Sequence, residues 1–177
     1  MKRTATTSAL VLALLTLHAQ EDMNVVWEMK LDHRFDHTGT GTEQRGFSYA
    51  ANDKEITVFN NATGAVRWTG RFKDLAPNLR KVDELTPFWE SNVLFLFDRK
   101  LGKDQIACLD LSDGHVLWTT DRYQNVTDES IVYVPEMDGF AITLKDKLVW
   151  LLARTGEERW STDKFKGVVG QYVVTPD

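Results

Sequence analysis

Two histidines have the spacing best suited to chemistry in this chain. His33 and His37 lie four residues apart within Asp32–His37, and on a helix that spacing would place two metal ligands on one face. The Thr- and Gly-rich residues that follow, 38–42, are instead typical of a chain among β-strands, and the sequence places no third ligand. We interpret the segment as a solvated loop and predict neither a metal site nor a cofactor site.

Other reactive residue types are equally isolated. The single cysteine, Cys108, lies in the apolar run Ile106–Leu109, so it cannot form an internal disulfide and is expected to be a small buried hydrophobic side chain. Asn61–Thr63 and Asn125–Thr127 match the glycosylation sequon. The first overlaps a turn, and chance explains the matches unless the source is eukaryotic.

Charge and motif content exclude several functions. The formal net charge of −5 and the pI near 5.4 oppose the phosphate attraction on which nucleic-acid binding depends, so we predict no nucleic-acid partner. The chain has no phosphate loop, no nucleophile elbow and no Cys-x-x-Cys pair. We assign no catalytic residue and favour a non-catalytic protein, with the enzyme alternative left open.

The chain is organised by three copies of one sequence motif. Each copy has an apolar strand-like run, a tight turn and a tryptophan, and the turns and tryptophans read Thr63–Trp68, Asp113–Trp118 and Thr155–Trp160. Thr-Gly or Asp-Gly between two such runs predicts a β-hairpin, since Gly accepts positive φ and Thr or Asp bonds back to the turn. The residues that define the repeat are Trp27, Gly64, Trp68, Gly114, Trp118, Gly156 and Trp160.

The repeat has a period near forty residues. Trp27, in a partial copy without its turn, lies 41 residues before Trp68, and the next two spacings are 50 and 42. The runs before the second and third turns are apolar on both faces, which antiparallel strands need only when sheets pack on both sides. This pattern predicts an all-β fold, a β-propeller built from blades of several strands.

This motif resembles the quinoprotein-type repeat, strand–Leu-Asp-x-x-Thr-Gly-x-x-x-Trp, of PQQ-type β-propellers. The resemblance covers about residues 45–165, although only Leu109-Asp110 reproduces the Leu-Asp step. The family includes pyrroloquinoline-quinone alcohol dehydrogenases and the non-enzymatic propeller lipoprotein of outer-membrane barrel assembly. It implies that Trp68, Trp118 and Trp160, on the outer strands, dock against the neighbouring blades.

The first twenty residues read as a signal peptide. Lys2 and Arg3 precede a mostly apolar stretch, Ala9–Leu17, and cleavage is expected after Ala19 or Gln20. The stretch is far shorter than the ~20 residues that span a bilayer. A lipid anchor is not supported, because there is no cysteine at the expected cleavage point. We predict an exported protein, periplasmic or extracellular, without a membrane span and with envelope association left open.

Residues 21–177 are predicted to form a partial propeller. Val25–Leu31 reads as a first strand, and blades are expected at about residues 36–72, 85–123 and 130–165, with a further blade beginning at 168–177. Closed propellers of this kind have ~4–8 blades. We therefore expect an open N-terminal arc of a longer ring, with about three four-stranded sheets.

The function expected from these features is an exported, non-catalytic binding or assembly scaffold in the cell envelope, with polypeptide partners. One alternative is the N-terminal part of a quinone- or metal-dependent oxidoreductase. Its ligand would require cations, a stacking residue and a carboxylate from many blades, and the vicinal Cys-Cys pair of quinone alcohol dehydrogenases is missing. A second alternative is an extracellular polymer- or carbohydrate-associated module.

Overall fold

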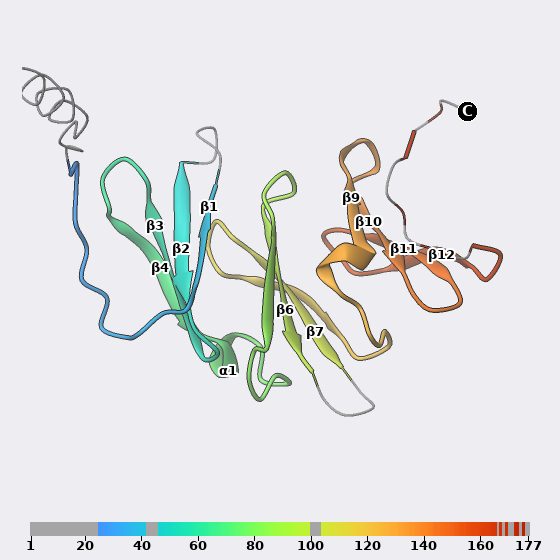
Figure 1. Ribbon diagram of the computed structural model, residues 1–177, viewed down its shortest axis with the longest axis horizontal. Coiled ribbons are helices and arrows are strands. Elements are labelled where there is room, and N and C mark those ends of the chain that lie inside the picture. Colours follow the sequence, from blue (N-terminus) through green and yellow to red (C-terminus); the bar gives the residue numbers. More distant parts are fainter. Residues whose placement is uncertain are drawn as a thin grey trace, which may run out of the picture.

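The fold consists of three antiparallel sheets arranged as an open arc. The computed structural model describes residues 25–41, 46–99, 104–165, 167, 169, 172–173 and 175, so the predicted signal peptide lies outside the described residues. Each sheet has four strands, which follow one another in chain order. Figure 1 shows the three sheets side by side along the long axis of the molecule. The all-β fold and the open arc of about three four-stranded sheets predicted from the sequence are confirmed.

The strands are short and evenly distributed. The first sheet consists of β1 (His37–Thr40), β2 (Phe47–Ala51), β3 (Glu55–Asn60) and β4 (Val66–Arg71). The second sheet consists of β5 (Glu84–Phe88), β6 (Val93–Asp98), β7 (Gln105–Asp110) and β8 (Val116–Thr120). The third sheet consists of β9 (Ile131–Val134), β10 (Gly139–Thr143), β11 (Leu148–Leu152) and β12 (Glu158–Thr162). Within the described residues, helical turns are limited to α1 (Phe72–Leu75), η1 (Asp128–Ser130) and η2 (Pro135–Met137).

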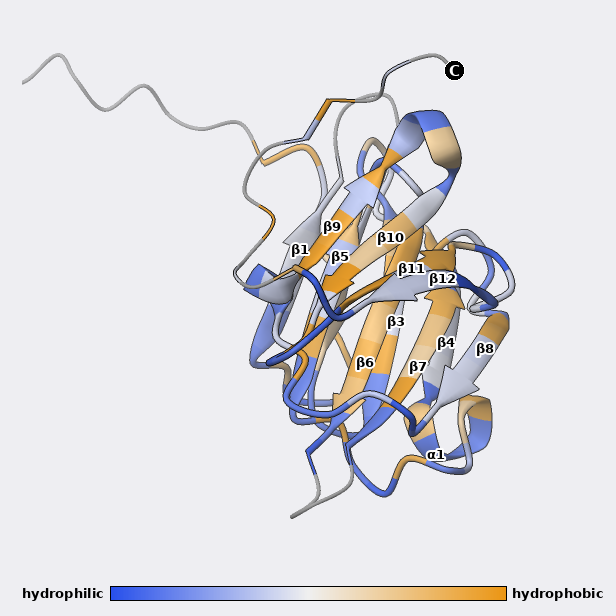
Figure 2. Ribbon diagram, turned by 90° about the vertical axis from the view of Figure 1, so that its right-hand side faces the viewer, coloured by the Kyte–Doolittle hydropathy of each residue, from blue (hydrophilic) through white to orange (hydrophobic). Residues whose placement is uncertain are grey.

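The second sheet explains why the middle strands are apolar on both faces. All six residues of β6 are buried. Leu94 and Leu96 belong to a core shared with the first sheet, while Phe95 and Phe97 belong to a core shared with the third. Because successive side chains of a strand point to opposite faces, one strand supplies both cores. Figure 2 shows the resulting apolar bands along β6 and β7.

Each sheet carries the same irregularity in its outer hairpin. The register shifts between Val58 and Phe59, between Cys108 and Leu109, and between Trp150 and Leu151. In each case the outer strand has one additional residue just before the tryptophan, which is the arrangement of a β-bulge. The common bulge shows that the three sheets are copies of one structural unit.

Two segments differ from the sequence-based expectations. Val25–Leu31 forms no strand; Val25 and Val26 are 79% and 82% exposed, because no described strand lies beside them to complete a ladder. The all-β pattern predicted no helix, but β4 is followed by the short helix α1, where the buried Phe72 donates its N–H to the Lys54 carbonyl at 2.7 Å. Among the described residues, no helix has the length and apolar character required to cross a membrane.

Candidate interaction surface on the third sheet

Tryptophans join each sheet to the next. Trp68 of the first sheet donates its Nε1–H to the carbonyl of Leu111 in the second, at 2.9 Å, and its ring covers Gly114. Trp118 of the second sheet donates in the same way to Ala153 in the third, at 2.9 Å, and covers Gly156. We call the turn glycine and the carbonyl three residues before it a tryptophan site.

The glycines are required at these sites for two reasons. Gly114 and Gly156 have φ values of +77° and +65°, where a side chain is strained. A Cβ atom would also approach the indole rings of Trp68 and Trp118 to 2.9 Å and 2.6 Å. The Thr-Gly and Asp-Gly turns therefore shape the hairpin and also receive the ring from the preceding sheet.

Trp27 fills the third tryptophan site without belonging to a strand. Its Nε1–H donates to the carbonyl of Asn61 at 2.6 Å, and its ring covers Gly64, where a Cβ would approach to 2.7 Å. The Trp27 ring also packs edge to face against the Phe59 ring, with the two ring centroids 5.5 Å apart. The first sheet thus receives Trp27 in the same way as the second sheet receives Trp68.

Trp160 occupies the same repeat position but has no tryptophan site. Its side chain is 44% exposed, whereas Trp118 is 9% exposed. It stacks on Trp150 of its own sheet, with ring centroids 6.2 Å apart and planes inclined by 14°. The docking against a neighbouring blade that the resemblance implied for Trp160 is absent from the described structure, because all three described sites hold other tryptophans.

An apolar surface surrounds Trp160. We define the open face of the third sheet by the residues that point away from the second sheet: Val134, Met137, Ala141, Leu148, Trp150 and Trp160. They line a shallow depression of about 370 Å³ together with residues 169, 172–173 and 175. Met137 and Trp160 are 48% and 44% exposed, whereas Val134, Ala141 and Trp150 are buried, so the accessible part of this face is centred on Met137 and Trp160. Exposed apolar patches can mark sites of interaction.

Tyr133 of β9 faces the second sheet. Its ring packs against Phe140 in the core between the two sheets, with ring centroids 5.2 Å apart. Its hydroxyl donates to Asp138 at 2.9 Å, and burial together with this hydrogen bond raises the pKa of Tyr133 to about 12. Tyr172 donates to the Tyr133 carbonyl at 3.3 Å, which brings Tyr172 against β9.

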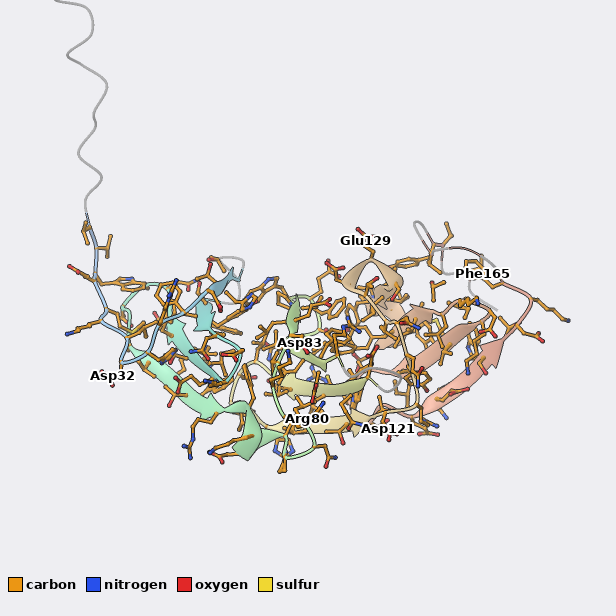
Figure 3. All side chains as sticks on the ribbon, turned by 60° about the horizontal axis from the view of Figure 1, so that its bottom comes forward. Asp32, Arg80, Asp83, Asp121, Glu129 and Phe165 are labelled. Carbon is orange, nitrogen blue, oxygen red and sulfur yellow. The ribbon has the colours of Figure 1, made fainter. Side chains whose placement is uncertain are left out.

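A second open face lies at the opposite end of the arc. A depression of about 290 Å³ separates the N-terminal segment, residues 29–33, from the first sheet, where Thr57, Val66 and Thr69 contribute to its lining. Figure 3 shows Asp32 at this end of the arc and Phe165 at the end formed by the third sheet. Both ends of the array therefore present faces that no described sheet covers.

The isolated reactive residues do not gather. His33 lies 3.7 Å from Glu55 and His37 lies 3.5 Å from Asp36, and the described part of the chain contains no group of three or more His, Cys, Asp or Glu side chains arranged for a metal ion. Cys108 is buried in the core between the second and third sheets, and burial raises the pKa of its thiol.

A polar contact also crosses between the second and third sheets. The Arg154 guanidinium donates to Asp110 at 3.0 Å and to the Ser91 carbonyl at 2.9 Å. Neither this contact nor the residues that form the tryptophan sites were predicted from the sequence. The signal for the sites was present, since each of Trp27, Trp68 and Trp118 is followed one repeat later by a turn glycine.

The repeated sheets and their tryptophan sites define a PQQ-type β-propeller, and sequence comparison agrees. Residues 13–167 match the family described as outer membrane protein assembly factor BamB, and the chain belongs to this family. No curated protein matches the sequence. This match confirms the predicted relationship to PQQ-like propellers.

Solved structures with the same fold include propellers of several kinds. BamB from Moraxella catarrhalis is 15% identical, with 66% of this chain and 33% of that chain aligned and a TM-score of 0.42. A eukaryotic initiation factor is 11% identical over 76% of this chain and 33% of that chain, with a TM-score of 0.53. The RRP9 WD40 repeats are 11% identical over 69% of this chain and 36% of that chain, with a TM-score of 0.50. The chain spans about a third of the length of these proteins, and its likeness to the last two shows the fold alone.

Proposed function

We propose that this chain is an exported, non-catalytic binding or assembly scaffold of the cell envelope, and that the open face of the third sheet receives β-structure from a polypeptide partner. The observation that carries the proposal is the exposure of Trp160, 44%, at a repeat position where Trp118 is 9% exposed. The family description, an outer membrane protein assembly factor, supports a role in assembly.

A polypeptide suits this surface better than a small molecule. The depression beside Trp160 is shallow and continuous with the apolar face, whereas small-molecule sites are concave and bury most of the ligand. The outer strand β12 is an edge of its sheet, so its outward backbone groups can pair with an added strand. The partner would contribute apolar side chains to the face and main-chain hydrogen bonds to the edge.

Site-specific cross-linking tests this proposal. A photoreactive p-benzoylphenylalanine in place of Trp160 should form an adduct with a polypeptide when the chain is illuminated in the cells that produce it. The same group in place of Lys73, exposed on α1, is the control and should give no such adduct. Absence of an adduct at position 160, or the same adducts at both positions, would contradict the proposal.

Export is tested separately by the mass of the protein. The pattern at residues 1–20 supports a cleaved signal peptide. The mature protein should therefore be recovered outside the cytoplasm with its N-terminus at Gln20 or Glu21. Recovery of the protein in the cytoplasm with Lys2 and Arg3 still present would contradict the export part of the proposal.

A further inference from the structure

A pocket of about 330 Å³ lies where the first sheet connects to the second. Its walls are the turn between β2 and β3 (residues 53–55), the end of β4 with the start of α1 (residues 71–73), and the connection that leads to β5 (residues 80–81). Figure 1 shows α1 between the first and second sheets, at the bottom of the view. The pocket is therefore formed entirely by the first sheet and the chain that leaves it.

Main-chain hydrogen bonds hold these walls together. Phe72 donates its N–H to the Lys54 carbonyl at 2.7 Å, and Val82 donates to the Asp53 carbonyl at 3.0 Å. Phe72 is 1% exposed and closes the floor of the pocket. Because the backbone around the pocket is fixed, a ligand would not have to order it on binding.

Cationic side chains dominate the lining, although the chain as a whole has a formal net charge of −5. The five cationic lining residues are Lys54, Arg71, Lys73, Arg80 and Lys81, and the two acidic ones are Asp53 and Glu55. The aliphatic stems of lysine and arginine also supply apolar surface below their charged groups. The pocket thus combines positive charge with apolar walls.

Three of the five cations already have carboxylate neighbours, and two do not. The neighbours are Arg71–Asp74 at 2.8 Å, Lys81–Asp83 at 2.6 Å and Arg80–Asp98 at 3.9 Å. Within the described part of the chain, Lys54 and Lys73 form no ion pair. Glu55, the nearer of the acidic lining residues to the first sheet's open face, lies 3.7 Å from His33. Two ammonium groups without a counter-ion beside one pocket attract two negative charges.

We propose that this pocket binds a small organic dianion, a phosphate monoester or a dicarboxylate with an apolar body. The two charges would face Lys54 and Lys73, and the body would pack against the aliphatic stems. The volume is at the lower end of the range for small-molecule sites, about 300–1,000 Å³. A long polyanion is disfavoured, because the net negative charge of the chain repels it outside the pocket. The inference goes beyond the scaffold function and does not depend on it.

An NMR titration of the full, ¹⁵N-labelled chain at low ionic strength tests the inference. The probes are phenyl phosphate and phthalate, used at about pH 7.5, where a phosphate monoester carries nearly two charges. We expect the amide signals of residues 53–55, 71–73 and 80–81 to shift with a Kd of about 0.1–1 mM for at least one probe. The tighter probe identifies which dianion the site prefers. Inorganic phosphate and benzyl alcohol, which each carry half of the recognised chemistry, should bind about tenfold more weakly or worse.

Paired lysine variants locate the charge recognition. Lys54→Gln combined with Lys73→Gln should weaken binding about tenfold or more. Lys145→Gln combined with Lys164→Gln removes the same charge from exposed positions of the third sheet, so it should change the Kd less than about twofold. All four side chains are exposed, and their substitution should leave the fold intact.

Four results would overturn the inference. The first is that neither probe shifts any signal at about 10 mM, which is far above the expected Kd. The second is that the shifts fall outside the three walls of the pocket. The third is that inorganic phosphate binds as tightly as phenyl phosphate, which would indicate an adventitious ion only. The fourth is that the two pairs of lysine variants weaken binding equally.

Discussion

The indole ring of Trp68 lies directly over Gly114, although the two residues belong to different sheets. A Cβ at Gly114 would approach Cε3 of Trp68 to 2.9 Å, and the indole Nε1–H reaches the carbonyl of Leu111 at 2.9 Å. One turn therefore sets the hairpin of its own sheet and the position of the sheet before it. The same relationship between Trp118 and Gly156 extends the array.

This relationship predicts a larger cost for a side chain at Gly114 than at another glycine of similar conformation. Gly46, with φ +66° and nothing within 4 Å of its added Cβ, is the matched control. Gly46→Ala should cost about 1–2 kcal/mol from backbone strain alone. Gly114→Ala should cost about 1–3 kcal/mol more because it displaces the indole ring. Denaturant unfolding measures both, and equal losses would contradict the tryptophan site.

The tryptophans should differ in their contribution to stability. Trp118→Ala should reduce the free energy of unfolding by about 3–5 kcal/mol, the range for emptying a large aromatic site. Trp160→Ala should cost less than Trp118→Ala, because Trp160 is 44% exposed and Trp118 is 9% exposed, and it loses chiefly the stacking on Trp150. A loss below about 1 kcal/mol at Trp118 would place it at the surface and contradict the repeat assignment.

A hydrogen bond across sheets predicts a dependence of stability on pH. Tyr123, after β8, donates to Glu158 of β12 at 2.8 Å, and this bond, with one from Ser161, lowers the pKa of Glu158 below 4.5. A lowered pKa in the folded state means that the stabilisation is present above pH 4.5 and is lost as the pH falls through the folded value. Glu158→Gln should thus lower Tm at pH 7 and have a smaller effect at pH 3.

Glu157→Gln is the control for this measurement. Glu157 is exposed and its carboxylate lies 3.9 Å from Arg159, so its substitution should leave Tm nearly unchanged at both pH values. On the alkaline side, burial and the bond to Glu158 raise the pKa of Tyr123 from 10.0 to about 12. Its contribution is complete below pH 10 and should be lost as the pH rises toward 12. If the difference in Tm between the natural chain and Glu158→Gln is as large in acid as at pH 7, this assignment is contradicted.

The sequence predicted the fold through its repeats more fully than it predicted the interaction surface. Local turn chemistry at Gly114 and the period of the tryptophans were sufficient to predict hairpins and sheets. The two-faced strand Leu148–Leu152 predicted packing on both sides, but strand periodicity does not say which side another sheet covers. The open face therefore became evident only when the neighbours of Trp150 and Trp160 were located.

The strand expected at Val25–Leu31 shows a related limit of sequence reasoning. The period placed Trp27 correctly in register, and the ring fills a tryptophan site. A strand, however, needs a neighbouring ladder as well as apolar residues, and the described residues provide none there. The short helix α1 was missed because four residues are too few to give helical periodicity.

Hydrogen exchange at the indole nitrogens tests the central claim most directly. The claim is that tryptophans tie consecutive sheets through a carbonyl and a turn glycine, and that Trp160 lacks such a site. NMR on the monomeric chain, with the indole signals assigned by single Trp→Phe variants, should show the Nε1–H protons of Trp68 and Trp118 exchanging about 100-fold or more slowly than that of Trp160. Equal exchange rates for the Nε1–H protons of Trp118 and Trp160, whether both are slow or both are fast, would contradict the account.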